Sequence, residues 1–354
     1  MKTARPITRS SLSSSRDPNA VLAALLGPRF VAYRAAWDEA AAGKRPAFPL
    51  HLDLDVISSC QLSCPMCPAG QPESPFPGLG RVLPETTLEA ALVESQKNQL
   101  PALRLGVTGE PLLLKNIAQY VQAARDRGVL DVALITNGQN LWPEMSQALI
   151  AAGLTRLMVS VDAATESTYR LVRPGGDWAR LKSNLRDFLA IRASLKSPLP
   201  LLRLSFVDLA LNAADKPLFE RDFGPLADYL TFQSYQSLGG LPNLNPGLDN
   251  APPASLSPGD VCLEPRCRLA LHADGGLFPC CSDFGRLQPL GYFPALSLSQ
   301  AWNSAPAREL ARDQGAFPQC RACQAAGSGQ LFHLKPPNCD RGQGVFAPPR
   351  PEGR

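Results

Sequence analysis

Three cysteines, Cys60, Cys64 and Cys67, fall within eight residues, with three residues between the first two and two between the last two. They directly follow a strand-like stretch, Leu50 to Ile57, in which apolar and polar residues alternate. The thiols are therefore expected on a loop at the carboxyl end of a strand, where α/β proteins place their functional sites. Three thiolates on one short loop suit an iron–sulfur cluster, and three ligands for a cluster that normally takes four leave one iron open.

Other uses of this cysteine trio fit the sequence less well. A structural zinc site needs four ligands, usually in separated pairs with histidine available, and the nearest histidine is His51. A disulfide would leave one thiol over, and a thioredoxin-like pair of Cys64 and Cys67 would not need Cys60. The cluster is the favoured interpretation, and zinc or redox use is the alternative.

The CxxxCxxC spacing directly after a first strand resembles the radical S-adenosylmethionine (SAM) superfamily. The resemblance implies that Cys60, Cys64 and Cys67 hold a four-iron four-sulfur cluster whose fourth iron is chelated by the amino and carboxylate groups of SAM. In that family one electron from the cluster cleaves SAM to a 5′-deoxyadenosyl radical, which abstracts a hydrogen atom from the substrate. Met66 stands where many members carry an aromatic residue near the adenine, and it can pack there.

A segment after the second expected strand, Gly106 to Pro111, resembles the GGEP segment of the same family, with Thr108 where the first glycine often stands. Gly109 permits a close approach of the backbone. The carboxylate of Glu110 can accept hydrogen bonds from the methionyl ammonium of SAM. The alternative is that Gly-Glu-Pro merely ends a strand.

The next two expected strands end in further segments that resemble SAM-binding positions. Ser160 and Asp162 match the family's Ser-x-Asp at the ribose, where a carboxylate accepts hydrogen bonds from hydroxyls, as in dinucleotide folds. The resemblance also implies SAM contacts for Thr136 and Asn137, and a pairing of Arg173 with the SAM carboxylate. The alternatives are a plain Asn-Gly turn at residues 137–138 and a surface salt bridge for Arg173.

A second group of cysteines lies in residues 259–325. An Asp-Gly signal for a two-residue turn at 274–275 predicts a hairpin whose returning strand delivers Cys280. The order of hairpin, Pro-Cys-Cys, tryptophan and Cys-x-x-Cys resembles the SPASM domain, which carries auxiliary clusters in one radical SAM branch. The resemblance implies a second four-iron four-sulfur cluster on Cys262, Cys280, Cys320 and Cys323.

The remaining cysteines are too few for two full auxiliary clusters. Cys267 is expected to be a buried thiol, with a ligand role as the alternative. Cys281 is expected not to ligate, because it would point to the opposite face from Cys280 in a regular strand. Cys339 is a bystander or a late ligand. A zinc ribbon is the alternative for the whole unit.

The length and the net charge of the chain limit the classes of protein to which it can belong. The 354 residues suffice for two domains, and the net charge of +4 without a basic block does not indicate nucleic-acid binding. Without a run of about 18 apolar residues, no membrane span is expected. The first sixteen residues are basic and serine-rich without an apolar core, so a disordered arm is favoured over a transit peptide and nothing indicates secretion. We expect a reducing cytoplasm with thiols committed to clusters.

Strand-like and helix-like segments alternate from Leu50 to Gln236, which predicts an α/β fold with a parallel sheet covered by helices. Periodicity does not say whether the sheet closes. The resemblance implies an open (β/α)6 partial TIM-type barrel with the site on its carboxyl-terminal rim, followed by a small cysteine-rich domain of β-hairpin plus helix. Strands are expected to begin near Leu50, Ala102, Asp131, Arg156, Pro200 and Tyr229, and helices to cover 20–42, 84–99, 116–127, 142–152, 177–196 and 213–223.

The predicted organisation has five parts. They are an N-terminal arm and helix at 1–48, the radical SAM partial barrel at 49–238, a proline-rich linker at 239–258, the SPASM-like domain at 259–326 and a proline-rich tail at 327–354.

The leading hypothesis is a radical SAM enzyme of the oxidoreductase or maturase type. Its substrate is unidentified and is either a peptide or protein side chain or a sugar-like small molecule, and no leader-recognition domain is apparent before the barrel. The auxiliary cluster would assist oxidation or substrate binding, and an electron donor such as flavodoxin or ferredoxin is implied. The competing hypothesis is a non-catalytic zinc- or cluster-bound scaffold protein.

Polar residues on the late strands are candidates for substrate contact, with a purely structural place in the barrel as the alternative. The three histidines, His51, His272 and His333, give no coherent general base and no metal spacing. The candidates for substrate contact are Arg203, Ser205, Gln233 and Tyr235.

Overall fold

The computed structural model describes residues 5–6, 10–13, 17–70, 79–235, 248, 260–283, 286–314, 317 and 320. The predicted tail and nearly all of the predicted linker lie outside these residues, as do Cys323, His333 and Cys339.

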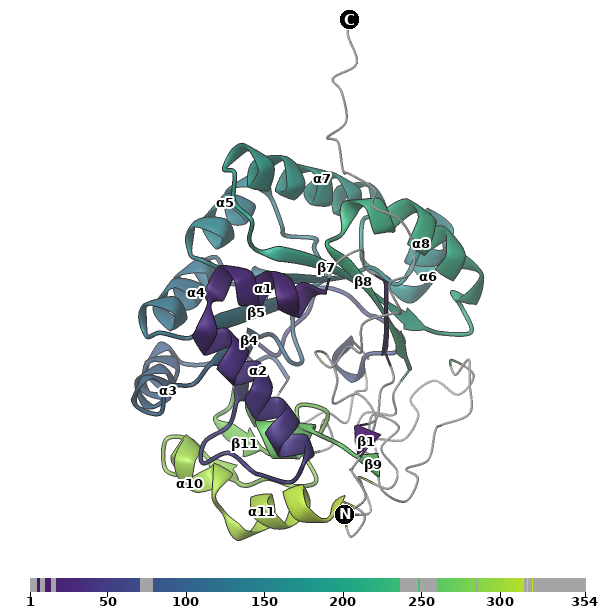
Figure 1. Ribbon diagram of the computed structural model, residues 1–354. Helices are drawn as coiled ribbons and strands as arrows, with labels where there is room; N and C mark the ends of the chain where they lie inside the picture. The colour runs from purple at the N-terminus through teal and green to yellow at the C-terminus, as the bar shows by residue number, and fades with distance from the viewer. Residues whose placement is uncertain are drawn as a thin grey trace, which may run out of the picture.

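The centre of the molecule is a sheet in which six parallel strands, β3 to β8, follow one another in chain order (Figure 1). At one edge of these six strands, β8 pairs with the antiparallel strand β2, and at the other edge β3 pairs with β10. The described sheet is therefore open, which confirms the expected partial barrel. The strands are β2 Ser10–Ser13, β3 His51–Leu54, β4 Ala102–Leu105, β5 Asp131–Thr136, β6 Arg156–Ser160, β7 Leu201–Asp208 and β8 Tyr229–Ser234.

Helices cover the outer face of this sheet and join each strand to the next (Figure 1). Their apolar sides pack on alternate strand residues, so that one large hydrophobic core lies between the two layers. The helices are α3 Glu85–Lys97, α4 Ile117–Asp126, α5 Pro143–Ala151, α6 Glu166–Val172, α7 Trp178–Ser194 and α8 Lys216–Phe223, with 3₁₀ turns at Pro68–Gly70, Pro111–Leu113, Ala213–Asp215 and Gly224–Leu226.

The N-terminal segment predicted as one helix over 20–42 forms two helices, α1 (Pro18–Leu26) and α2 (Pro28–Ala41). The break lies at Gly27, which has a φ of 76° and is followed by Pro28, a residue without a backbone donor. Tyr33 and Trp37 of α2 pack on the residues that begin the strands, so the two helices close the amino end of the barrel. The strand-end residues in this cluster are Leu50, Ala102, Leu201 and Tyr229.

The cysteine-rich unit is joined to the barrel by its own first strand. β10 (Arg268–Leu271) pairs in parallel with β3, and β11 (Gly276–Phe278) returns antiparallel to β10. The turn between them is one residue longer than predicted, because His272 still pairs with Gly276 and leaves a three-residue loop in which Gly275 has a φ of 86°. The remaining elements are β1 Arg5–Pro6, which pairs with β9 Asp260–Val261, and α9 Glu264–Cys267, β12 Gly291–Tyr292, α10 Leu298–Trp302 and α11 Ala305–Arg312.

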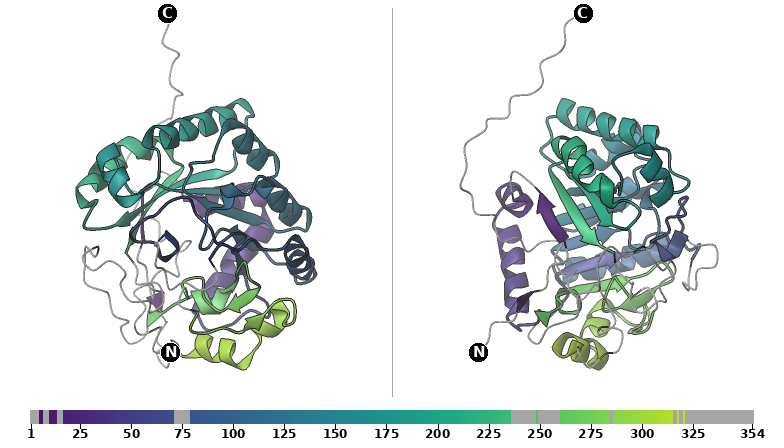
Figure 2. Two further views of the ribbon diagram at one scale, coloured as in Figure 1. Left: turned by 180° about the vertical axis from the view of Figure 1, so that it is seen from behind. Right: turned by 90° about the vertical axis from the view of Figure 1, so that its right-hand side faces the viewer.

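Figure 2 shows α10 and α11 beside the hairpin at one end of the sheet. A side chain of the barrel fixes this end, because the carboxylate of Glu94 on α3 accepts hydrogen bonds from the backbone nitrogens of Leu298 (2.9 Å) and Ser299 (2.8 Å) at the start of α10. The C-terminal unit is thus both an extension of the sheet and a neighbour of its helices. None of the helices in the described part of the chain has the length and apolar character needed to cross a membrane.

Candidate metal and cofactor site

The three cysteines Cys60, Cys64 and Cys67 lie on the loop after β3, at the carboxyl end of the sheet. The loop is folded on itself: Cys67 donates its backbone N–H to the carbonyl of Cys64 (3.0 Å), and the amide of Leu62 donates to the sulfur of Cys60 (3.5 Å). No disulfide joins the three residues. Burial raises the pKa of all three thiols, that of Cys67 to about 11, so binding of a metal centre here would release protons.

The spacing of these sulfurs distinguishes a cluster from a single metal ion. The thiols are close enough to raise one another's pKa values, yet their three sulfur atoms do not all lie within 4.8 Å of one another. One tetrahedral zinc, with zinc–sulfur bonds of about 2.3 Å, would hold them roughly 3.8 Å apart. The donor set therefore fits a polynuclear iron–sulfur centre better than zinc.

Gly109 brings the loop after β4 against the cysteine loop. A Cβ atom on this glycine would lie 2.1 Å from the carbonyl oxygen of Ile57 and 2.6 Å from that of Ser59, so no side chain fits. The next residue, Glu110, donates its backbone N–H to the Ser59 carbonyl at 2.8 Å. The GGEP-like segment and the chain that enters the cysteine loop are thus in direct backbone contact.

Asp55 holds the same segment in place through hydrogen bonds. The sequence shows this residue only as a polar position in an alternating strand. Its fully buried carboxylate accepts hydrogen bonds from the backbone nitrogen (3.0 Å) and the hydroxyl (2.6 Å) of Thr108. Burial raises the pKa of this carboxyl, and these hydrogen bonds oppose the rise. The signal that could have identified Asp55 is its position one residue after the end of β3, directly before the loop.

The Glu110 carboxylate connects the loop after β4 with the end of β5. It accepts hydrogen bonds from the hydroxyl of Thr136 (2.6 Å) and from the backbone nitrogens of Asn137 (2.6 Å) and Leu112 (2.9 Å). Burial raises the pKa of Glu110. The Asn137 amide in turn lies 3.7 Å from the sulfur of Cys60. Residues that the sequence assigned separately to SAM binding therefore meet at the cysteine loop.

Gln61, inside the cysteine motif, was not assigned a role from the sequence. Its side chain exchanges hydrogen bonds with that of Asn137, at 3.2 and 3.4 Å. On the same side, Gly175 has a φ of 87°, and a Cβ there would lie 3.1 Å from the Gln61 carbonyl. Pro174 accepts a hydrogen bond from the amide of Ser63 (3.0 Å), so the loop after α6 also packs on the cysteine loop.

Arg173 from this loop forms a buried ion pair with Asp162 through two guanidinium nitrogens and places the third, Nη1, 3.6 Å from the sulfur of Cys64. The sequence placed Asp162 at a ribose, but its carboxylate is fully buried and also accepts from the Val207 amide (2.7 Å). In the structure this carboxylate therefore orients Arg173. Ser160 is half-buried at the end of β6, and Met66 packs against the main core.

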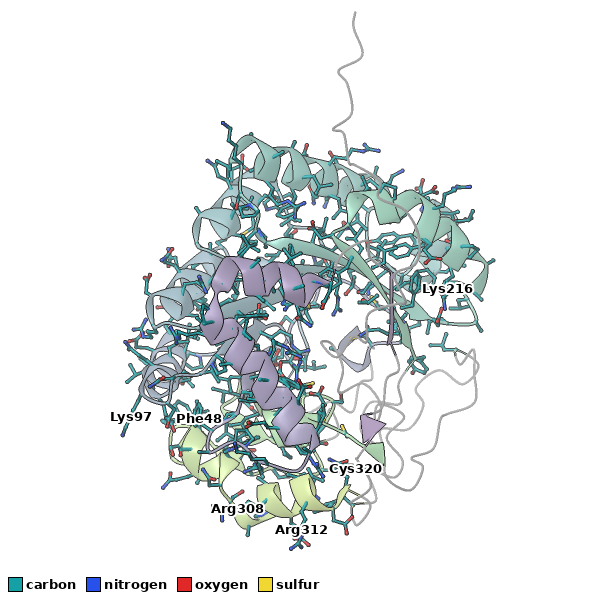
Figure 3. All side chains as sticks on the ribbon, in the orientation of Figure 1. Phe48, Lys97, Lys216, Arg308, Arg312 and Cys320 are labelled. Atoms are coloured by element: carbon teal, nitrogen blue, oxygen red, sulfur yellow. The ribbon has the colours of Figure 1, made fainter. Side chains whose placement is uncertain are left out.

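The second cysteine group is less compact in sequence. The Cys262 thiol is close enough to that of Cys280 to raise its pKa. The side chain of Gln314 holds Cys262 in place, because it accepts a hydrogen bond from the backbone N–H of Cys262 (2.9 Å) and donates one to its carbonyl (2.6 Å). Cys320 lies beyond α11, in the lower part of the molecule (Figure 3). Cys323 is outside the described residues.

The expectation that Cys281 points away from Cys280 is wrong. β11 ends at Phe278, so the strand is not regular at this point and the two thiols are hydrogen-bonded to each other. Cys281 also lies 3.5 Å from the carboxylate of Glu264. Cys267 is fully buried in the apolar cluster below the barrel, and burial raises its pKa to about 12, as suits a structural thiol.

The interior of the barrel carries paired charges. Asp53 on β3 lies 2.8 Å from Arg104, 3.1 Å from Arg268 and 3.3 Å from His51. Arg268 also pairs with Glu264 (3.2 Å), and Arg156 with Asp131 (3.0 Å). Asp53, Glu264 and Cys281 lie within 4.8 Å of one another, but the arginines beside them compensate the carboxylates and disfavour a metal cation there.

Two family models match the chain in the regions of the two cysteine groups. The model of the radical SAM superfamily matches residues 54–194, which include the cysteine loop and every residue assigned to SAM. The SPASM model, described as an iron–sulfur cluster-binding domain, matches residues 262–324. The order of the two matches is the order that the cysteine spacings predicted.

Similar proteins agree with this assignment. A probable GTP 3′,8-cyclase of Methanocaldococcus jannaschii is 26% identical over 185 residues, which are 51% of this chain and 58% of that protein. The chain thus spans less than two thirds of this relative. The fold is similar to that of BtrN in complex with AdoMet and 2-DOIA (TM-score 0.54, 15% identity, 82% of this chain and 98% of that one). It is also similar to anSMEcpe with bound AdoMet and Cp18Cys peptide (TM-score 0.55, 13% identity, 80% and 91%). The chain therefore carries a radical SAM domain at residues 54–194 and, after it, a SPASM domain at residues 262–324.

Proposed function

We propose that this protein is a radical SAM enzyme that abstracts hydrogen from a peptide or small-molecule substrate. One observation carries the proposal: three cysteine sulfurs, Glu110, Asn137 and Arg173 converge from separate loops on one end of an open barrel. When bound, a four-iron four-sulfur cluster with SAM supplies one-electron cleavage of the sulfonium and a 5′-deoxyadenosyl radical that takes hydrogen from the substrate.

The residues of the rim divide this task. Cys60, Cys64 and Cys67 would hold the cluster, and three protein ligands would leave one coordination position for SAM. Glu110 accepts hydrogen bonds from the ammonium, and Arg173, oriented by Asp162, faces the carboxylate. Gly109 permits the close approach of SAM to the backbone, Thr136 and Asn137 border it, Ser160 meets the ribose and Met66 the adenine.

The SPASM unit holds the second cluster. We assign Cys262, Cys280, Cys320 and Cys323 as its ligands, with a role in accepting an electron from the substrate radical or in orienting the substrate. Four thiolates complete the coordination, so this cluster would not bind SAM. The fully buried Cys267 remains outside the ligand set.

The substrate class is open between two kinds of molecule. BtrN is described with 2-DOIA and anSMEcpe with a peptide, whereas the Methanocaldococcus relative is named for a reaction on GTP. For this chain we propose either a peptide or protein side chain or a small polar molecule that enters from the rim. A reduced flavodoxin or ferredoxin is the proposed electron donor, and the cytoplasm is the proposed compartment.

The test is anaerobic purification and reconstitution, followed by iron and sulfide counts. About eight irons per chain are expected for two clusters. With SAM and a reductant, the protein should release 5′-deoxyadenosine. The Cys64→Ala variant should lose this release, and the matched control Cys267→Ala should keep it. Zinc without iron would instead support the non-catalytic scaffold.

A further inference from the structure

Arg203, the third residue of β7, is a buried cation that has no counter-charge among the residues that the structure describes. Its side chain faces the inside of the barrel, in register with Tyr229 on β8, and the residue is 3% exposed. Neither Nε nor Nη1 of its guanidinium has a hydrogen-bond partner in the structure, and no carboxylate of the described residues forms an ion pair with it. A guanidinium that is removed from water without a partner is strongly unfavourable.

The neighbouring groups increase this cost. Burial lowers the pKa of Arg203 to about 10, and the positive charges of Arg104, Arg156 and Arg268 contribute to the decrease. These three arginines have carboxylate partners: Arg104 and Arg268 share Asp53, and Arg156 pairs with Asp131. The interior therefore has an excess of positive charge at Arg203.

Hydroxyl groups lie next to this cation on its carboxyl-terminal side. Ser160, Ser205 and Thr231 occupy the same register on β6, β7 and β8 and form a continuous row, two residues beyond Arg203. Thr231 is 5% exposed, and its hydroxyl makes no hydrogen bond within the described part of the chain. The guanidinium of Arg203 and the hydroxyl of Thr231 can donate hydrogen bonds to an oxyanion. The hydroxyl of Ser205 donates to the Val159 carbonyl at 3.5 Å, a long contact that an anion would replace.

We propose that Arg203 and the hydroxyls of Ser205 and Thr231 bind an anionic oxygen group of the substrate, a carboxylate or a phosphate. The inference rests on the proposed function, because it takes the barrel interior as the place of the substrate. Helices α1 and α2 close the amino end of the barrel, so the group enters from the rim and passes the cysteine loop. The anion would then fix the substrate at its far end and hold the reacting carbon nearer to the rim.

The experiment measures the thermal unfolding midpoint of the full chain at constant ionic strength and pH. Phosphate and acetate are titrated separately against chloride. The wild type should show a saturable rise of the midpoint with at least one of the two anions, because a ligand that binds the folded state stabilises it. A response to phosphate alone, to acetate alone or to both identifies the class of anion that the site accepts.

The variant Arg203→Met should weaken the apparent anion affinity by about tenfold or more, since it removes the charge and keeps a side chain of similar length. Without anion it should unfold no earlier than the wild type, because an unpaired buried charge has been removed. The matched control Arg180→Met changes an arginine that is half exposed and lies 3.8 Å from Asp177, and its anion response should equal that of the wild type. Thr231→Val is the second variant and should weaken the response several-fold.

Two results would overturn the anion site: a wild type without a saturable response, or variants of Arg203 and Thr231 that respond as the wild type does. If Arg203→Met does not fold, Thr231→Val still decides. Release of 5′-deoxyadenosine by the wild type is measured in parallel. Its absence would count against the proposed function and leave the anion response readable, whereas release together with a flat anion response would reject the anion site alone.

Discussion

The two cysteine regions arrange the same side chain in different ways. The first places three thiols within eight residues of one loop and surrounds them with polar groups from the loops after β4, β5 and α6. The second collects its thiols from positions that are up to 58 residues apart, 262 and 320, and fixes them with a hairpin, Gln314 and α11. Three protein ligands beside hydrogen-bonding groups suit a metal centre whose coordination is completed by a bound molecule. A dispersed set with its own scaffold is suited to a centre that the protein encloses.

The strongest test of this contrast compares Cys60→Ala with Cys280→Ala. Each variant should lose about four irons per chain, because each removes one of the ligands that we propose for a different cluster. Only Cys60→Ala should abolish the release of 5′-deoxyadenosine from SAM in the absence of substrate. Iron counts and chromatography of the product measure both effects. Loss of release in Cys280→Ala with the first cluster still present would contradict the division of roles.

Gly109→Ala should be the most disruptive change outside the cysteines. The new Cβ would meet the Ile57 carbonyl at 2.1 Å, so the backbone must move, at a cost of about 1–3 kcal/mol, and the movement displaces the cysteine loop. SAM binding, measured by equilibrium dialysis of the reconstituted protein, should be lost. Gly224→Ala is the matched control, because its Cβ would meet a Leu230 methyl at 3.8 Å. Equal SAM affinity of the two variants would show that the contact at Gly109 is unimportant.

Asp55→Ala should lower the free energy of unfolding by about 3 kcal/mol, since it leaves the buried N–H and hydroxyl donors of Thr108 without an acceptor. Urea denaturation measures this change. The control Asp222→Ala removes an exposed carboxylate that pairs with Arg221 on the surface and should have almost no effect. If Asp55→Ala matches the control, the loop after β4 does not depend on this carboxylate.

A pH-dependent effect concerns the strand pair that joins the two regions. Burial lowers the pKa of His51 and His272 from 6.5 to about 4, so both are neutral in the folded protein at neutral pH. The unfolded chain binds more protons below pH 6.5, and stability should therefore fall as the pH drops from 6.5 towards 4, by about 2 kcal/mol per histidine between pH 7 and 5. Urea denaturation at both pH values should show a shallower loss in a His51→Gln/His272→Gln variant. An unchanged slope would contradict neutral buried histidines.

The sequence predicted local features of the fold well. Apart from α6, which is not among the predicted helices, the strands and helices from residue 50 to 234 lie within a few residues of the predicted positions, because apolar periodicity and Pro or Gly stops determine them locally. The break at Gly27 and Pro28 was missed although its signal is local, because the apolar spacing continues across it.

The sequence could not predict side-chain contacts that depend on the tertiary fold. No periodicity shows that Asp162 turns to Arg173, that Asp55 holds the loop after β4, or that Cys281 lies beside Cys280. The polar residues of the strands were visible as an alternation, but their charges find each other only across the barrel. Buried ion pairs depend on which strands become neighbours, and that information is not local.

The pairing of β10 with β3 has a consequence for synthesis of the chain. Residues 51–54 leave the ribosome long before residues 268–271, with which they hydrogen-bond. At typical elongation rates of about 5–20 residues per second, the edge of the first strand waits on the order of 10–40 s for its neighbour. During this interval the nascent chain carries an uncovered strand edge next to the three thiols of the cysteine loop. Shortening the chain ahead of residue 268 would leave this edge open permanently.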